Sequence, residues 1–184
     1  MPALAQAHHF MGGRLPRSWM EGFLSGLGHP VIGVDHFAFV VAAGFLLAFV
    51  PRGLWALVAL IAGALVGAAL HLSGGALPGA EAMIAVSVIC VGVLVAFARP
   101  WPTVPLAALL ALAGVLHGYA YAESIFGAEP APLAAYLGGF SLIQLALGAG
   151  AFFIQRRLGE RFRRPVALAL GGAASALGAL SLLA

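Results

Sequence analysis

The sequence predicts an all-α integral membrane protein: six transmembrane helices preceded by a short amphipathic interfacial segment, with the N-terminus and the C-terminus both outside. The first supporting observation is the composition, because 62% of the 184 residues are apolar, 8% are charged and the mean hydropathy is +1.05. A soluble domain carries roughly 25% charged residues. The other two observations are six apolar stretches of membrane-crossing length and an uneven distribution of arginine.

We divide the chain into an N-terminal part, residues 1–28, and a six-helix transmembrane domain, residues 29–184. The start contains Ala5-Gln6-Ala7, an A-x-A cleavage pattern, without the charged and apolar regions of a complete signal peptide. We interpret it as the remnant of a secretory signal, with His8 and His9 beginning the mature chain; a disordered terminus is the alternative. Residues 10–28 mix charged and bulky apolar side chains, which predicts a helix lying at the membrane interface.

Six apolar stretches follow, separated by segments that contain Pro, Gly or Arg. They cover residues 31–50, 54–73, 80–98, 103–122, 133–154 and 165–184. Each is close to the ~20 residues that a helix needs to cross a bilayer. The second and fourth stretches contain Gly63-x-x-x-Gly67 and Gly114-x-x-x-Gly118, small-residue patterns that predict close helix approach without specifying an oligomer.

All nine basic residues are arginines, and their positions predict the orientation of the chain. The connections after the first, third and fifth stretches contain seven arginines, whereas those after the second and fourth contain none. The positive-inside rule places the arginine-bearing connections in the cytoplasm, as expected for a multi-pass protein of a bacterial inner membrane. Topology therefore explains the net charge of +3, and we expect a lipid bilayer, not a nucleic acid, as the partner of these arginines.

The ionisable residues other than arginine collect on the outer side of this predicted topology. All six histidines and five of the six acidic residues fall in the outer half or beyond it. Such groups are costly inside a membrane and usually line a substrate path. Six of them are candidate metal ligands: His29, Asp35, His36, His71, Glu81 and His117.

The central motif is residues 29–36, His-Pro-Val-Ile-Gly-Val-Asp-His, at the start of the first apolar stretch. Because proline suits the first turn of a helix, we expect His29 to be the N-cap. On one continuous helix, His29, Gly33 and His36 would share a face, and Asp35 would bind the same ion from the side or orient an imidazole. The alternative is a capping histidine with a buried Asp–His pair that only joins helices.

The remaining candidates also have structural interpretations. His71 suits an interfacial cap, and Glu81 complements the helix dipole at the start of the third stretch. His117 suits a hydrogen bond that holds two helices together. Tyr119 and Tyr121 fit an aromatic belt at the membrane surface better than a ligand set.

Imidazole and carboxylate ligands without thiolate suit borderline divalent ions such as nickel, cobalt or zinc. The single cysteine excludes an intramolecular disulfide and a thiolate cage. The sequence contains no Walker A, H-E-x-x-H or G-x-S-x-G motif, which favours a secondary transporter over an ATP-driven one or an enzyme. We expect no cofactor beyond the transported metal ion. The alternatives are a metal-binding accessory or sensor protein without translocation and a metal-dependent intramembrane hydrolase.

Three motifs are similar to those of a known family. Residues 29–36 fit His-Pro-x-x-Gly-x-Asp-His, residues 77–81 read Leu-Pro-Gly-x-Glu, and residues 117–120 read His-Gly-x-Ala. In these motifs, and over nearly its whole length, the sequence resembles the HupE/UreJ family of nickel permeases associated with hydrogenase and urease maturation.

The resemblance implies import of nickel, or of cobalt, with the histidine and aspartate of the first span essential. We expect release to a cytoplasmic metallochaperone of hydrogenase or urease maturation. Many relatives read His-Gly-x-Ala-His-Gly-x-Glu in the fourth span, whereas this chain has Tyr121 at the second histidine and Ala122 at the second glycine.

Overall fold

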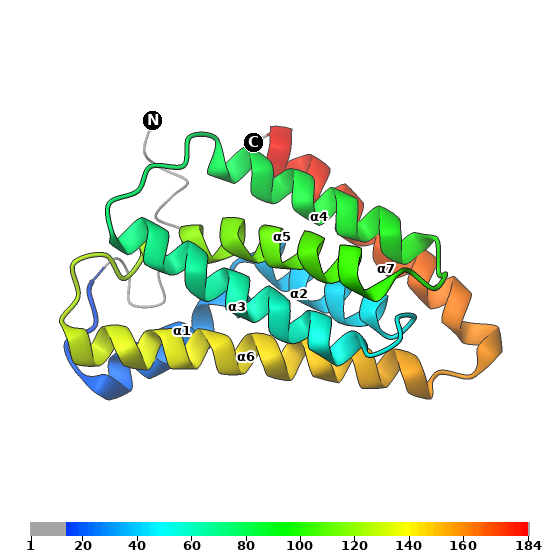
Figure 1. Cartoon of the computed structure of the whole chain (residues 1–184), viewed down its shortest axis with the longest axis horizontal. Coiled ribbons are helices and arrows are strands. Elements are labelled where there is room, and N and C mark those ends of the chain that lie inside the picture. The colour runs from blue at the N-terminus through cyan, green and yellow to red at the C-terminus, as the bar shows by residue number, and fades with distance from the viewer. Residues whose placement is uncertain (1–13, 184) are drawn as a thin grey trace.

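The computed structural model describes residues 14–183, which form seven α-helices packed into a bundle (Figure 1). The helices are α1 (Trp19–Ile32), α2 (Val34–Leu47), α3 (Gly53–Leu72), α4 (Ala80–Ala96), α5 (Thr103–Glu123), α6 (Pro130–Arg157) and α7 (Glu160–Leu183). The all-α prediction is confirmed for this part of the chain. The proposed cleavage pattern Ala5-Gln6-Ala7, with His8 and His9, lies outside the described residues.

The first apolar stretch is not one continuous helix. α1 and α2 are separated at Gly33 and bent by 79° relative to each other. Gly33 has an extended backbone, with φ −71° and ψ 101°. Pro30 lies inside α1, where it has no N–H to donate to the preceding turn and so weakens the helix just before the break.

α1 also begins well before the predicted start. Its N-cap is Ser18, whose Oγ accepts a hydrogen bond of 3.2 Å from the backbone N–H of Glu21. The prediction of His29 as N-cap is therefore wrong, because this residue lies in the last turn of α1. The helix runs through residue 28, so the N-terminal segment and the first motif share one element. Trp19, at the start of α1, is 55% exposed.

Four helices of the described chain, α3, α5, α6 and α7, are long and apolar enough to cross a membrane, and the bent α1–α2 pair makes a fifth candidate span. α4 has 17 residues, about 25 Å at a rise of ~1.5 Å per residue, and is shorter than these four. A multi-pass membrane protein follows from these lengths and compositions, while the count of six crossings stays a prediction.

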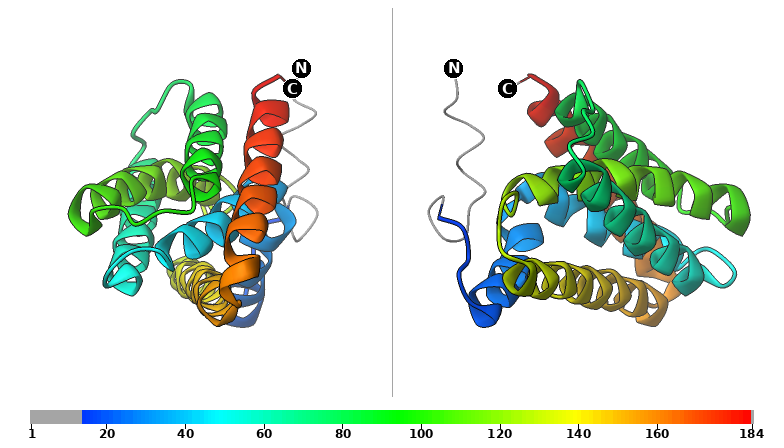
Figure 2. Two further views of the ribbon diagram at one scale, coloured as in Figure 1. Left: turned by 90° about the vertical axis from the view of Figure 1, so that its right-hand side faces the viewer. Right: turned by 60° about the vertical axis from the view of Figure 1, so that its left-hand side comes forward.

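α2 is the central helix, and most of it is buried. It contacts α1, α3, α4, α6 and α7. Figure 2 shows the pairs around it, with α1 beside α6 and α4 beside α7. The membrane-facing sides of the outer helices carry exposed apolar side chains such as Val66, Leu112 and Leu168, as expected where lipid replaces water.

α3 and α5 approach each other to backbone contact. A Cβ added to Gly67 would lie 1.9 Å from the carbonyl oxygen of Val115, and one added to Gly118 would lie 1.9 Å from that of Ala64. The close approach predicted from the two Gly-x-x-x-Gly patterns is confirmed. This contact holds His117, the neighbour of Gly118, in a fixed place inside the bundle.

The connections group by charge at the two ends of the bundle. The α2–α3, α4–α5 and α6–α7 connections lie at the right in Figure 1, and the α3–α4 and α5–α6 connections lie at the opposite end. The seven arginines lie in the first three connections or in the helix ends that flank them. We call the first end the arginine end. The grouping agrees with the predicted topology, although which side of the membrane each terminus faces stays a prediction.

Candidate functional site

The break between α1 and α2 brings two predicted ligands together. The ring centroids of His29, at the end of α1, and His36, at the start of α2, are 5.9 Å apart. Each residue is only 5% exposed. A Cβ at Gly33 would lie 2.7 Å from Cδ2 of His36, so glycine is needed to seat this ring. The two imidazoles therefore meet across a bend, not on a shared face of one helix.

His36 continues into a buried chain of hydrogen bonds. Its Nδ1 lies 2.8 Å from Nδ1 of His117 on α5, and Nε2 of His117 lies 2.9 Å from Oγ of Ser87 on α4. His117 is 1% exposed, and its ring stacks on Phe39 at a centroid distance of 4.0 Å. One side chain on each of three helices is thus linked through polar contacts.

The protons in this chain can be assigned by counting donors. Ser87 has one hydroxyl proton and donates it to the carbonyl of Ile84 at 2.7 Å, so it accepts from Nε2–H of His117. A neutral His117 then accepts at Nδ1 from Nδ1–H of His36. In a neutral His36, this places the lone pair on Nε2, the form in which imidazole binds metal.

His29 is held by a second polar group. Its Nδ1 lies 3.0 Å from Oη of Tyr136 on α6 and 3.1 Å from Oγ of Ser124. Both hydroxyls donate to the backbone carbonyl of Tyr121, at 2.8 Å and 3.0 Å. The two hydroxyl oxygens are also 3.1 Å apart. With both protons directed at the carbonyl, Nδ1–H of His29 is the donor to the two oxygens. A neutral His29 therefore also carries its lone pair on Nε2.

Tyr121 lies between these two groups and is fully buried. Its ring centroid is 4.6 Å from that of His36 and 5.1 Å from that of His29. Its hydroxyl has no hydrogen-bond partner among the described residues. The interpretation of Tyr121 as part of an aromatic belt is therefore wrong, because the face of α5 that carries it points into the bundle.

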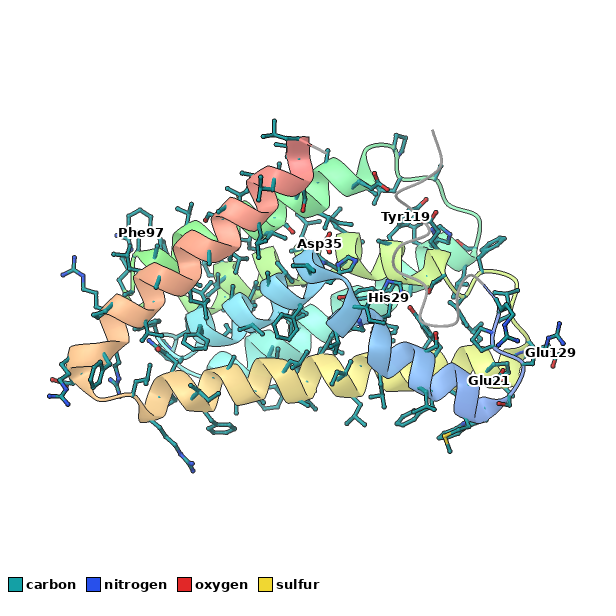
Figure 3. The ribbon with its side chains drawn as sticks, turned by 180° about the vertical axis from the view of Figure 1, so that it is seen from behind. Glu21, His29, Asp35, Phe97, Tyr119 and Glu129 are labelled. Carbon is teal, nitrogen blue, oxygen red and sulfur yellow. The ribbon has the colours of Figure 1, made fainter. Side chains whose placement is uncertain are left out.

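Asp35 lies in the first turn of α2, where its charge complements the helix dipole. Its Oδ1 accepts a 2.9 Å hydrogen bond from the backbone N–H of His36. Figure 3 shows Asp35 and His29 near the α1–α2 junction, in the part of the bundle that contains Tyr119 and away from Phe97 near the arginine end. The carboxylate therefore lies beside the backbone of His36, at the start of α2.

Two further candidates lie apart from this group. The ring of His71, in the last turn of α3, contacts Tyr119 and Phe126 at centroid distances of 4.5 Å and 5.7 Å. Glu81 is exposed in the first turn of α4. Over residues 14–183, no three His, Cys, Asp or Glu side chains are already arranged as a metal-binding group. The six predicted ligands are not gathered in one pocket, and their assignment as ligands stays a prediction.

The residues that hold the histidines were not predicted as part of the site. The sequence does contain a signal for Ser124, because Ser124 and Tyr121 follow His117 at i+7 and i+4, positions that share a helix face. The same spacing along residues 117–124, which end at the C-cap of α5, indicates both as neighbours of His117. No spacing rule links Ser87 or Tyr136 to the motif, because they come from other helices.

The sequence is similar to a known protein family over almost its whole length. The model of a family described as HupE / UreJ protein matches residues 1–181. The chain belongs to the HupE/UreJ family. A relative named Protein HupE, from Rhizobium leguminosarum bv. viciae, is 32% identical over 187 residues, covering 97% of this chain and 90% of its own length. No solved structure matches the chain.

Membership confirms the resemblance found in the three motifs. The HupE/UreJ family is associated with nickel and cobalt transport, which fits a membrane bundle with buried imidazoles. It is a family of metal transporters, not of enzymes.

Proposed function

We propose that this chain is a secondary transporter that imports a divalent transition metal, most favourably nickel, across the bacterial inner membrane. The observation that supports this most directly is the pair of buried imidazoles, His29 and His36, at the break between α1 and α2. In membrane proteins, broken helices are tolerated where they line a cavity or an ion site. In this proposal the two Nε2 atoms and the Asp35 carboxylate move together to bind the ion, because over residues 14–183 these groups are not already arranged around one point.

The ligand chemistry supports nickel or cobalt. Two imidazoles and one carboxylate suit a borderline divalent ion, whereas magnesium prefers oxygen alone and cuprous ion prefers sulfur. A separation of 5.9 Å between the two ring centroids is one that a single ion about 2.1 Å from a nitrogen of each ring would bridge. Zinc fits the same ligands, and family membership favours nickel or cobalt over it.

The position of the site supports entry from outside. α5 runs from the arginine end, and His117 lies in its last two turns, so the histidines are in the half of the bundle away from the arginines. The positive-inside rule puts the arginine end in the cytoplasm. A 2+ ion that enters along the membrane potential gains roughly 4–5 kcal/mol per 100 mV, which drives uptake without ATP. Release to a cytoplasmic metallochaperone of hydrogenase or urease maturation completes the proposed route.

Uptake of radioactive nickel into proteoliposomes tests the proposal. The intact protein should accumulate nickel in response to a negative interior, and His36→Ala should abolish accumulation while the protein still inserts. Ser141→Ala is the matched control, because the Ser141 hydroxyl donates to the Leu137 carbonyl in its own helix. Nickel binding without accumulation by the intact protein would instead support an accessory or sensor protein.

A further inference from the structure

Three buried positions with unpartnered polar atoms run from the histidines toward the arginine end. They are Oη of Tyr121, both carboxamide atoms of Gln144, and Oε1 of Gln155, none of which has a hydrogen-bond partner among the described residues. A buried polar atom without a partner costs about 1–3 kcal/mol. Such atoms in a membrane bundle therefore call for a ligand or water that meets them.

Of the three residues, Gln144 has the most side-chain polar atoms without a hydrogen bond. It is 0% exposed, and neither its Oε1 nor its Nε2 is bonded, so a complete carboxamide is left unsatisfied. By contrast, Nε2 of Gln155 donates to the carbonyl of Arg163 at 3.3 Å. Among the described residues, no hydrogen bond offsets the cost of burying the Gln144 carboxamide.

Helix register places Gln144 directly beyond the histidines. A Cβ on Gly44 of α2 would lie 2.3 Å from the carbonyl oxygen of Gly148 of α6, which fixes how these helices pair. Both helices run toward the arginine end, as Figure 1 shows, so Gln144 is level with residue 40 of α2. That level is one helical turn, about 6 Å, beyond His36.

The same face of α6 connects the two ends of the bundle. Tyr136 contacts His29, Phe140 and Gly148 are buried on either side of Gln144, and Gln155 lies two residues before the end of the helix. These positions follow one another at helical spacing. α6 therefore presents a line of buried side chains from the proposed metal site to the arginine end. Beyond Tyr136, the polar groups on this line are the carboxamides of Gln144 and Gln155.

We propose that Gln144 is a translocation-path residue, whose carboxamide oxygen contacts the hydrated divalent cation after it leaves His29 and His36. This inference rests on the proposed import function. A neutral oxygen ligand suits a transit position, because it replaces part of the hydration shell without holding the ion as tightly as an imidazole or carboxylate would. In this proposal the histidines bind the ion as it enters, and Gln144 contacts it as it moves toward the arginine end.

The test separates transport from binding and from folding. Gln144→Leu removes the carboxamide and leaves a buried side chain of similar size, so the thermal unfolding midpoint should stay the same or rise. Nickel affinity, measured by calorimetry with Ni²⁺ alone, should stay within twofold. Nickel uptake into proteoliposomes should fall at least tenfold. Uptake within twofold of the wild-type level, or loss of nickel binding, would overturn the proposal.

A labelling experiment tests the position without relying on uptake. Cys90 is exposed, so it is first replaced in a Cys90→Ser background, into which Gln144→Cys or the control Ser141→Cys is introduced. The thiol of Gln144→Cys should react with a water-soluble, positively charged methanethiosulfonate, and Ni²⁺ should slow the reaction. A thiol as unreactive as that of Ser141→Cys would contradict an aqueous path at Gln144. If wild-type protein takes up no nickel, the import function fails, and the labelling result still decides whether the path exists.

Discussion

Replacing Gly33 by alanine should disrupt the histidine site while leaving the bundle folded. The added Cβ would lie 2.7 Å from Cδ2 of His36, whereas ordinary van der Waals contact begins at 3.4 Å. The ring must therefore retreat by about 0.7 Å. The Nδ1 atoms of His36 and His117 are now 2.8 Å apart, and an added displacement of this size carries them beyond normal hydrogen-bond range.

The free energy follows from the loss of that bond. A broken hydrogen bond that leaves a buried partner unsatisfied costs about 1–3 kcal/mol. Alanine also favours a continuous helix over glycine by about 1 kcal/mol, which opposes the bend between α1 and α2. If the free energy of nickel binding becomes less favourable by the ~1–3 kcal/mol of the lost hydrogen bond, nickel affinity falls roughly 5- to 150-fold.

Calorimetric titration of the purified protein with Ni²⁺ checks this prediction. Gly138→Ala is the matched control, because a Cβ at Gly138 meets nothing within 4 Å. Helical content by circular dichroism should be unchanged in both variants. Equal nickel affinities for Gly33→Ala and Gly138→Ala would refute the argument that the Gly33 break seats His36.

Three further predictions follow from the same contacts. Ser87→Ala removes the acceptor for Nε2–H of His117 and should lower nickel affinity roughly 10- to 100-fold, whereas Ser87→Thr keeps a hydroxyl and should restore it. In the alanine variant, ¹⁵N NMR of labelled histidine should show that His36 loses its Nδ1–H tautomer. An unchanged tautomer would contradict the proton assignment. Gly118→Ala places a Cβ 1.9 Å from the Ala64 carbonyl oxygen and should destabilise the fold by about 1–3 kcal/mol, which lowers the thermal unfolding midpoint. Gly172→Ala is the control, because the space around Gly172 is open and the midpoint should not change. Equal midpoints for the two variants would argue against the α3–α5 contact. Nickel uptake should fall as the outside pH drops through about 6, because protonated imidazole cannot bind metal; uptake that is flat from pH 8 to pH 5 would argue against histidine ligands.

Much of the fold could be predicted because its causes are local. Apolar runs and their separators indicate helices, and the Gly-x-x-x-Gly patterns indicate close contact, which α3 and α5 make through Gly67 and Gly118. The arginines indicate which connections lie together, and the structure places them at one end. Composition and spacing carry this information without reference to tertiary structure.

The break at Gly33 could not be predicted in this way. A single glycine in an apolar run is common in membrane helices and usually leaves them continuous. Here α1 is turned aside because it packs along α6, where a Cβ on Gly22 would lie 2.2 Å from the carbonyl oxygen of Pro132 and one on Gly26 would lie 2.2 Å from that of Tyr136. The bend is a consequence of tertiary packing, so the prediction of a capped, continuous first span was wrong.

The candidate site could be predicted in part for the same reason. His29 and His36 were identified from their motif, and His117 from its charge within an apolar span. Their partners Ser87 and Tyr136 come from α4 and α6 and are brought in only by the fold. The interpretation of His117 as a hydrogen-bonding residue between helices, offered as an alternative to a ligand, agrees with its contacts to α2 and α4.

The most direct test of the central claim is X-ray absorption at the nickel K-edge of the nickel-loaded protein, compared with His36→Ala. The claim is that His29 and His36 together hold the transported ion. It predicts scattering from two imidazole rings in the wild-type protein and the loss of at least one in the variant. A shell of oxygen ligands alone, identical in both proteins, would contradict it.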